Sequence, residues 1–180
     1  QVVSGIVSSL AKTPSPTCAL DFRPITVLGL LYRCWSSFHA FVALRKLDCH
    51  LPAGLAGSRP NKFAGQIWAS LLWDIEQAYS ADDDLGGVIA DVQKAFNHIP
   101  RLAIMEICAH VGLPSSLLLG WTGALTSMAR RFQIRGHITE PLYSCTGFPE
   151  GCALSCVAMI MIDWTLHAWF QHMMPLARPL

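Results

Sequence analysis

Apolar residues recur at helical spacing along much of the chain. Between residues 25 and 49 they stand three or four positions apart, as Leu31, Trp35 and Phe38 do, which predicts a helix after a short strand at 25–28. The same spacing predicts further helices over 61–79, 101–111, 114–128 and 152–173. Gly112 and Pro114 stand where the end of one helix and the first turn of the next are expected.

Two stretches have the pattern of strands. Residues 87–92 (GVIADV) form a short apolar run rich in β-branched residues, which predicts a buried strand. Residues 130–144 alternate around Gly136 and predict a β-hairpin, followed by a tight loop at 145–151. Because strands and helices interleave without regular β-α-β spacing, the sequence predicts the α+β class, with short antiparallel strands packed against several helices.

The composition supports a folded core. Of the 180 residues, 52% are hydrophobic and 14% are charged, which excludes global disorder. The most apolar stretch, 151–170, is interrupted by Asp163, so no membrane span is expected. The chain begins at Gln1 without a leader pattern, and we expect it to be a piece of a longer protein.

Charge and cysteine usage narrow the picture further. Residues 1–62 hold seven Lys or Arg against two Asp or Glu, whereas residues 63–100 hold one against six. A basic front segment can attract polyanions, although such imbalances also occur on ordinary solvated faces. The seven Cys include no CxxC pair, which disfavours a zinc site and fits a reducing intracellular compartment, either nucleus or cytoplasm.

Asp91 is the most informative single residue, because it lies at the end of the predicted strand. An ionised carboxylate there costs several kcal/mol, on the order of 3 or more, unless it is paired or binds a cation. The alternative is an Asp that caps the transition from strand to loop.

Several stretches, in order along the chain, resemble the motifs of reverse transcriptases of the non-LTR retrotransposon and group II intron type. Gly87–Phe96 (GVIADVQKAF) resembles the first catalytic motif, an apolar strand with Asp followed by x-x-K-A-F. Asp21–Leu28 (DFRPITVL), with Leu31–Arg33 (LYR), resembles the fingers motif, and Gly54–Pro60 resembles the segment that links it to a helix. Gly147–Ser155 (GFPEGCALS) resembles the palm motif G-x-P-Q-G-x-x-L-S.

The resemblance covers about residues 18–164 and implies a right-hand polymerase fold. Residues 1–86 would form a fingers-like helical segment with a basic N-terminal part. Residues 87–180 would form a partial palm, comprising the Asp91 strand, the hairpin 130–144 and the long helix 152–173. The family's Tyr-x-Asp-Asp hairpin and its thumb are not found in the 180 residues. We therefore expect a fragment that cannot polymerise alone, since one carboxylate cannot organise two metal ions.

The resemblance implies an RNA-directed DNA polymerase whose partners are an RNA template, a DNA primer and dNTPs. Developing negative charge in nucleotidyl transfer needs divalent cations, here two Mg²⁺ ions with Mn²⁺ as a substitute. Asp91 would be the catalytic carboxylate and a metal ligand, and the backbone carbonyl of Val92 would help to hold the second ion.

Nucleotide binding is implied for five residues. Arg23 would bind the triphosphate, because a guanidinium offers planar bidentate donors. Phe96, preceded by Ala95, would be the steric gate that excludes a 2′-hydroxyl, and Glu150 and Gly151 would approach the nucleotide from the palm loop. The alternatives are a core aromatic at Phe96 and an ordinary surface arginine at Arg23.

Template or primer contacts are implied for Arg33, Arg59, Gly147 and Pro149. A solvated surface position is the alternative for each arginine, and an ordinary tight turn is the alternative for the loop.

The sequence departs from the family pattern at three positions. Glu150 stands where Gln is usual, Asn97 stands where Asp often follows the gate, and Cys156 replaces a Pro. A carboxylate near a triphosphate is electrostatically unfavourable unless it is neutralised. The alternatives are therefore a decayed, non-catalytic relative that binds nucleic acid, a viral RNA polymerase palm, and an unrelated domain with chance matches.

Overall fold

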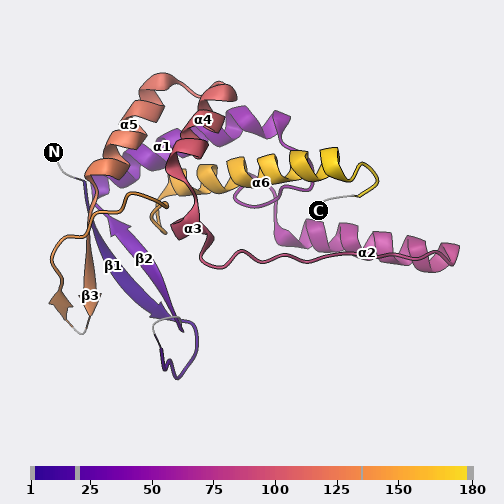
Figure 1. Ribbon diagram of the computed structural model, residues 1–180, viewed down its shortest axis with the longest axis horizontal. Coiled ribbons are helices and arrows are strands. Elements are labelled where there is room, and N and C mark those ends of the chain that lie inside the picture. The colour runs from indigo at the N-terminus through magenta and orange to yellow at the C-terminus, as the bar shows by residue number, and fades with distance from the viewer. Residues whose placement is uncertain (1–2, 19–20, 135, 178–180) are drawn as a thin grey trace.

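The computed structural model describes residues 3–18, 21–134 and 136–177. Within these residues the chain forms one sheet and a group of helices (Figure 1). The strands are β1 (Ser4–Ala11), β2 (Phe22–Leu28), β3 (Ala129–Ile134) and β4 (His137–Ile138). The α-helices are α1 (Leu30–Leu47), α2 (Ala64–Ala81), α3 (Ala95–His98), α4 (Arg101–His110), α5 (Ser115–Ser127) and α6 (Ala153–Met173).

The sheet has the strand order β2-β1-β3-β4. β1 pairs with β2 in the antiparallel sense but with β3 in the parallel sense, so the sheet is mixed and the prediction of purely antiparallel strands is wrong. Parallel pairing is possible because the helices between β2 and β3 provide the long crossover that such a pair needs. The predicted domain boundary at residue 86 stays a prediction. The pairing of β1 with β3 connects the segment before this boundary to the segment after it.

The core lies between α1, α4, α5 and α6. Trp121 of α5 and Phe148 are both fully buried, and their ring centroids lie 5.4 Å apart. The first half of α6 follows them into the core with Leu154, Val157 and Met161, which recur at helical spacing and are 0% exposed. Each such side chain stabilises the fold by about 1.5–3 kcal/mol on burial.

The predicted helices are confirmed, since α1, α2, α4, α5 and α6 occupy the expected stretches within a few residues at their ends. Gly112 has φ +82° directly after α4, a left-handed conformation that favours glycine, and Pro114 directly precedes α5. α6 is the one described helix long and apolar enough to cross a membrane by length and composition. That measure is weak, because a core helix passes it equally well.

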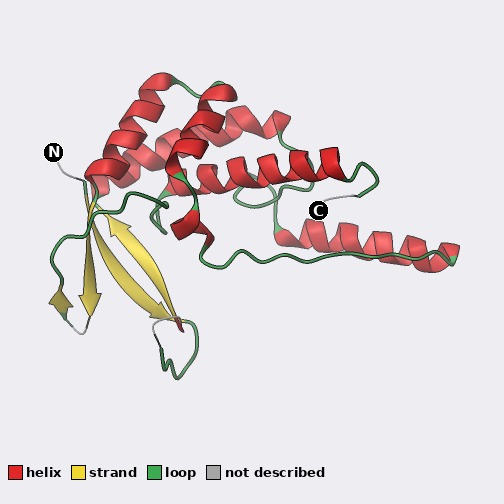
Figure 2. Cartoon of the chain, in the orientation of Figure 1, coloured by secondary structure: helices red, strands yellow, loops and turns green. Residues whose placement is uncertain are grey.

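The predicted buried strand at 87–92 is wrong. These residues lie in an extended loop between α2 and α3, drawn as loop in Figure 2, and Val88 and Ile89 are 95% and 89% exposed. The described residues contain no strand that hydrogen-bonds to this segment. A β-prone sequence becomes a strand only where a partner satisfies its backbone N–H and C=O groups.

Candidate functional site

Three segments that are distant in sequence meet at one place: the edge strand β2, the short helix α3 and the loop before α6. The Phe148 N–H donates to the Phe96 carbonyl at 2.6 Å, and the Gly147 N–H donates to the Ile99 carbonyl at 3.1 Å. On the other side of the loop, the Thr26 N–H donates to the Glu150 carbonyl at 2.7 Å. Backbone hydrogen bonds therefore fix the loop between α3 and β2.

Two glycines allow this close approach. Gly147 has φ +70°, and a Cβ there would lie 2.5 Å from the Asn97 carbonyl oxygen. Gly151 has φ +106°, and a Cβ there would lie 2.6 Å from the Thr26 carbonyl oxygen. A side chain at either position would both strain the backbone and collide with a neighbouring main chain.

Asn97 and Glu150 face each other across the junction. The Asn97 side-chain amide Nδ2 donates to Oε1 of Glu150 at 3.4 Å, and both residues are half-buried. The hydrogen bond thus joins two of the three residues that depart from the resembled motifs. The loop therefore carries its negative charge beside a specific amide partner.

Phe96 and Ala95 are half-buried on α3, directly after Lys94, which adopts the left-handed conformation with φ +50°. The Phe96 carbonyl accepts the hydrogen bond from the loop, while Phe96 remains partly accessible to solvent. The geometry thus joins Phe96 to the loop that carries Glu150 and the exposed Gly151, whereas the role of Phe96 as a gate stays a prediction.

Asp91 and Val92 lie in the exposed loop before α3, and Val92 is 62% exposed. Asp91 forms no hydrogen bond or ion pair with the described residues. The premise that Asp91 is a buried carboxylate at the end of a strand is wrong, because Asp91 is exposed in a loop. Five residues separate it from Phe96, a span of at most about 18 Å.

The prediction of a metal site at Asp91 and Val92 stays a prediction. No group of three or more His, Cys, Asp or Glu side chains that suits a metal ion occurs among the described residues. Mg²⁺ often takes only one or two carboxylates and keeps several waters. The solvated Asp91 carboxylate and the Val92 carbonyl could hold one such ion, but the described residues do not assemble a two-metal site.

Arg59 is a structural residue in this conformation. Its side chain is buried, and it donates four hydrogen bonds: to Oδ1 and the carbonyl of Asp48 at 2.8 and 3.0 Å, and to the carbonyls of Pro52 and Leu55 at 2.6 and 2.9 Å. These donors close the loop after α1, and the template contact predicted for Arg59 stays a prediction.

The other predicted binding residues differ in accessibility. Arg23 on β2 and Arg33 on α1 are exposed, and neither guanidinium bonds to another described residue. Gly147 and Pro149 are buried, and the template contact predicted for them stays a prediction. Both belong to the loop itself, which is hydrogen-bonded to the α3 segment through the N–H groups of Gly147 and Phe148.

Arg101 was not predicted, yet it holds the loop in place. It donates to the carbonyls of Ser144, Gly147, Thr146 and Leu125 at 2.6, 2.7, 3.2 and 3.2 Å. Burial, and then the charge of nearby Arg130, lower the pKa of Arg101. The sequence could have indicated this role. A positive charge at the first residue of a helix interacts unfavourably with the helix dipole, so Arg101 at that position suggests that the side chain has other partners.

The sequence matches no known protein family model, and no curated protein is significantly similar to it.

Proposed function

We propose that the chain is a polymerase domain of the reverse-transcriptase type, which binds a primer–template and a dNTP for nucleotidyl transfer. The observation that carries the proposal is the convergence of three stretches, each selected for its resemblance to a separate motif. The loop of the third stretch is hydrogen-bonded to both of the others. Its Phe148 N–H donates to the Phe96 carbonyl, and its Glu150 carbonyl accepts from the Thr26 N–H. Chance matches scattered along an unrelated chain have no reason to meet at one junction.

The accessible groups at this junction suit a nucleotide. Phe96 offers a flat apolar surface to a sugar, and Gly151 permits close approach of backbone. Arg23 lies on the same strand as Thr26 and keeps its guanidinium free of described partners. A guanidinium is planar and permanently charged, and it can donate two parallel hydrogen bonds to one phosphate.

The ion would be Mg²⁺, or Mn²⁺ in its place, which neutralises charge on the transferring phosphate. In this proposal Asp91 and the Val92 carbonyl orient one ion. Residues 1–180 contain no Tyr-x-Asp-Asp sequence, and no Asp or Glu follows Asp163. We therefore expect these residues to bind substrates without extending a primer unless further carboxylates are supplied.

A second candidate is a non-catalytic nucleic-acid-binding relative. The solvated, unpaired Asp91 favours it, because nothing among the described residues fixes that carboxylate at the junction. The Asn97–Glu150 hydrogen bond favours the catalytic candidate instead. The amide and the carboxylate are matched at two positions where the sequence departs from the resembled motifs, and a decaying chain has no reason to acquire such a match.

The test measures dNTP and rNTP binding to a complex of the protein with an RNA template and a DNA primer. We expect Mg²⁺-dependent dNTP binding that Asp91→Asn weakens at least about 10-fold, and a preference over rNTP that Phe96→Ala reduces. Asp84→Asn is the matched control, since Asp84 is an exposed acid in the same extended loop.

Equal effects of Asp91→Asn and Asp84→Asn would show a general charge effect and refute the metal-ligand role of Asp91. Binding of primer–template without any Mg²⁺-dependent nucleotide binding would select the non-catalytic candidate. Primer extension by residues 1–180 themselves would refute the expectation that further carboxylates are needed.

A further inference from the structure

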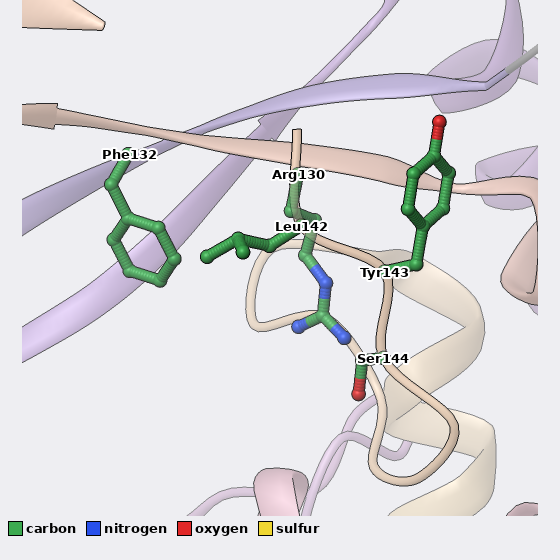
Figure 3. A pocket seen from close by; sticks show the side chains of 5 residues that line it. All are labelled: Arg130, Phe132, Leu142, Tyr143 and Ser144. Carbon is green, nitrogen blue, oxygen red and sulfur yellow. The ribbon is translucent and has the colours of Figure 1, made fainter. Parts of the chain in front are cut away.

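A pocket lies on the sheet beside the segment that leads into the loop of the three-way junction, since Arg101 donates to the carbonyls of both Ser144 and Gly147. It has a volume of about 210 Å³ and is lined by Arg130, Phe132, Leu142, Tyr143 and Ser144. Figure 3 shows the Arg130 guanidinium pointing toward Ser144, with Phe132 and Leu142 to one side and Tyr143 to the other. Apart from Arg130 and the hydroxyl groups, the lining is apolar.

The strand pattern places Arg130 there. In the parallel pairing with β1, Arg130 lies opposite Gly5 and Phe132 lies opposite Val7, which is 2% exposed. Arg130 and Phe132 therefore project from the inner face of the sheet. The neighbouring Arg131 lies on the other face, because successive side chains alternate along a strand.

Arg130 has no counter-charge among the described residues. Among the residues that the structure describes, none forms an ion pair or a side-chain hydrogen bond with its guanidinium. The hydroxyl of Ser144 already donates to the Thr146 carbonyl at 2.6 Å. Burial lowers the pKa of Arg130, and the Arg101 charge lies close enough to interact with it. A half-buried, unpaired guanidinium is unfavourable in the free protein and gains most from an anion.

We propose that this pocket binds a nucleotide unit of a single-stranded nucleic acid, with Arg130 donating to the phosphate. The apolar walls from Phe132 and Leu142 suit a sugar edge, and Tyr143, which is 63% exposed, can stack on a base outside the pocket. The volume suits a phosphate with its sugar rather than a drug-sized molecule, whose pockets hold about 300 Å³ or more. A free nucleotide carries the same phosphate, sugar and base. The experiment below distinguishes binding of a strand from binding of a free nucleotide.

The test measures binding of fluorescein-labelled single-stranded RNA and DNA 10-mers by anisotropy in EDTA. The chelator removes any contribution from the Asp91 metal site, so this proposal can fail independently of the proposed polymerase function. Unlabelled nucleoside monophosphate serves as competitor and tests the free-nucleotide source. The variants are Arg130→Gln and its matched control Arg131→Gln, which removes the same charge one residue away on the opposite face.

We expect Arg130→Gln to weaken oligonucleotide binding about 10-fold or more and Arg131→Gln to weaken it less than about 3-fold. The slope of log affinity against log salt should fall by about 0.7 for Arg130→Gln, as for one lost phosphate contact. Arg130→Lys should recover only part of the affinity, and Tyr143→Ala should weaken binding about 5-fold or more.

The unfolding midpoint separates a ligand-binding role from a structural one. Because Arg130 has no described partner, Arg130→Gln should leave the midpoint unchanged or raised. A lowered midpoint, equal effects of the two arginine variants, or no binding of either oligonucleotide would overturn the proposal. Binding of the monophosphate as tight as that of the oligonucleotides would overturn the assignment to a strand.

Discussion

The half-buried pair of Asn97 and Glu150 allows a direct test of whether the junction is adapted to its unusual residues. The amide donates to the carboxylate at 3.4 Å. We predict that Asn97→Asp destabilises the protein, that Glu150→Gln has a small effect, and that the double variant recovers most of the loss. The reason is that the double variant restores one acid and one amide with their places exchanged.

The expected size follows from the separation of the two side chains. Two carboxylates about 4 Å apart repel by about 4 kcal/mol at an effective dielectric constant of 20 and by about 1 kcal/mol in bulk water. Because both side chains are half-buried, we expect Asn97→Asp to cost about 1–3 kcal/mol. Glu150→Gln replaces a hydrogen bond to a charged group with a neutral one and should cost about 1 kcal/mol or less.

The assay is urea unfolding of the wild type, both single variants and the double variant, analysed as a double-mutant cycle. We expect a coupling free energy of at least about 1 kcal/mol in favour of the double variant. The dNTP-binding assay adds a functional reading, in which Glu150→Gln alone gives no gain. Additive effects on stability, or a large gain in dNTP affinity from Glu150→Gln, would refute the view that the pair is adapted.

Three further predictions concern the supports of the loop and of α6. Gly147→Ala should destabilise by about 2 kcal/mol or more, measured by urea unfolding, because it adds left-handed strain to a contact of 2.5 Å with the Asn97 carbonyl oxygen. Arg101→Met should cost about 3 kcal/mol or more in the same assay, since it leaves several loop carbonyls without their donor. Burial raises the pKa of Asp163 above its ordinary value of 3.8, so ionisation penalises the folded state as pH rises through that raised pKa. Asp163→Asn should therefore raise the unfolding midpoint at pH 7 but not at pH 3; a gain at both would refute this cause.

Local signals predicted the helices well. α4 and α5 are separated by Gly112 and Pro114, and both residues act through their own backbone geometry. The spacing of apolar residues likewise identified α6, because its buried positions recur every three or four residues. Such information lies within a few neighbouring residues.

The strand at 25–28 is confirmed within β2, and the hairpin in 130–144 is confirmed by the antiparallel pair of β3 and β4. The predicted strand at 87–92 failed because a strand also needs a partner. The run 87–92 has strong β propensity, but propensity supplies no hydrogen-bonding partner. Conversely, β1 was not predicted, because SGIVSSLA is rich in small polar residues, yet it pairs on both sides in the sheet. β1 is therefore a strand because β2 and β3 pair with its backbone, and not because of its own composition.

The arginines show why the binding residues were only partly predictable, and they suggest a criterion for finding them. Arg59 and Arg101 each donate four hydrogen bonds to atoms of the chain, so their charge is already used to close loops. Arg23 and Arg130 have no such partners among the described residues. The sequence shows the same residue type in all four places, because donors are satisfied by carbonyls that only the fold brings near.

The number of unsatisfied donors, rather than net charge, therefore indicates where this protein can bind an anion. The formal net charge is only +1, and part of the positive charge is held by internal carbonyls and by Asp48. What remains for a polyanion includes Arg23 and Arg131 on the outer face of the sheet and Arg130 in the pocket on its inner face. Removing Arg59 or Arg101 should mainly lower stability, whereas removing Arg130 should mainly lower affinity for nucleic acid. That contrast between variants of equal charge is the strongest physical test of the binding surface.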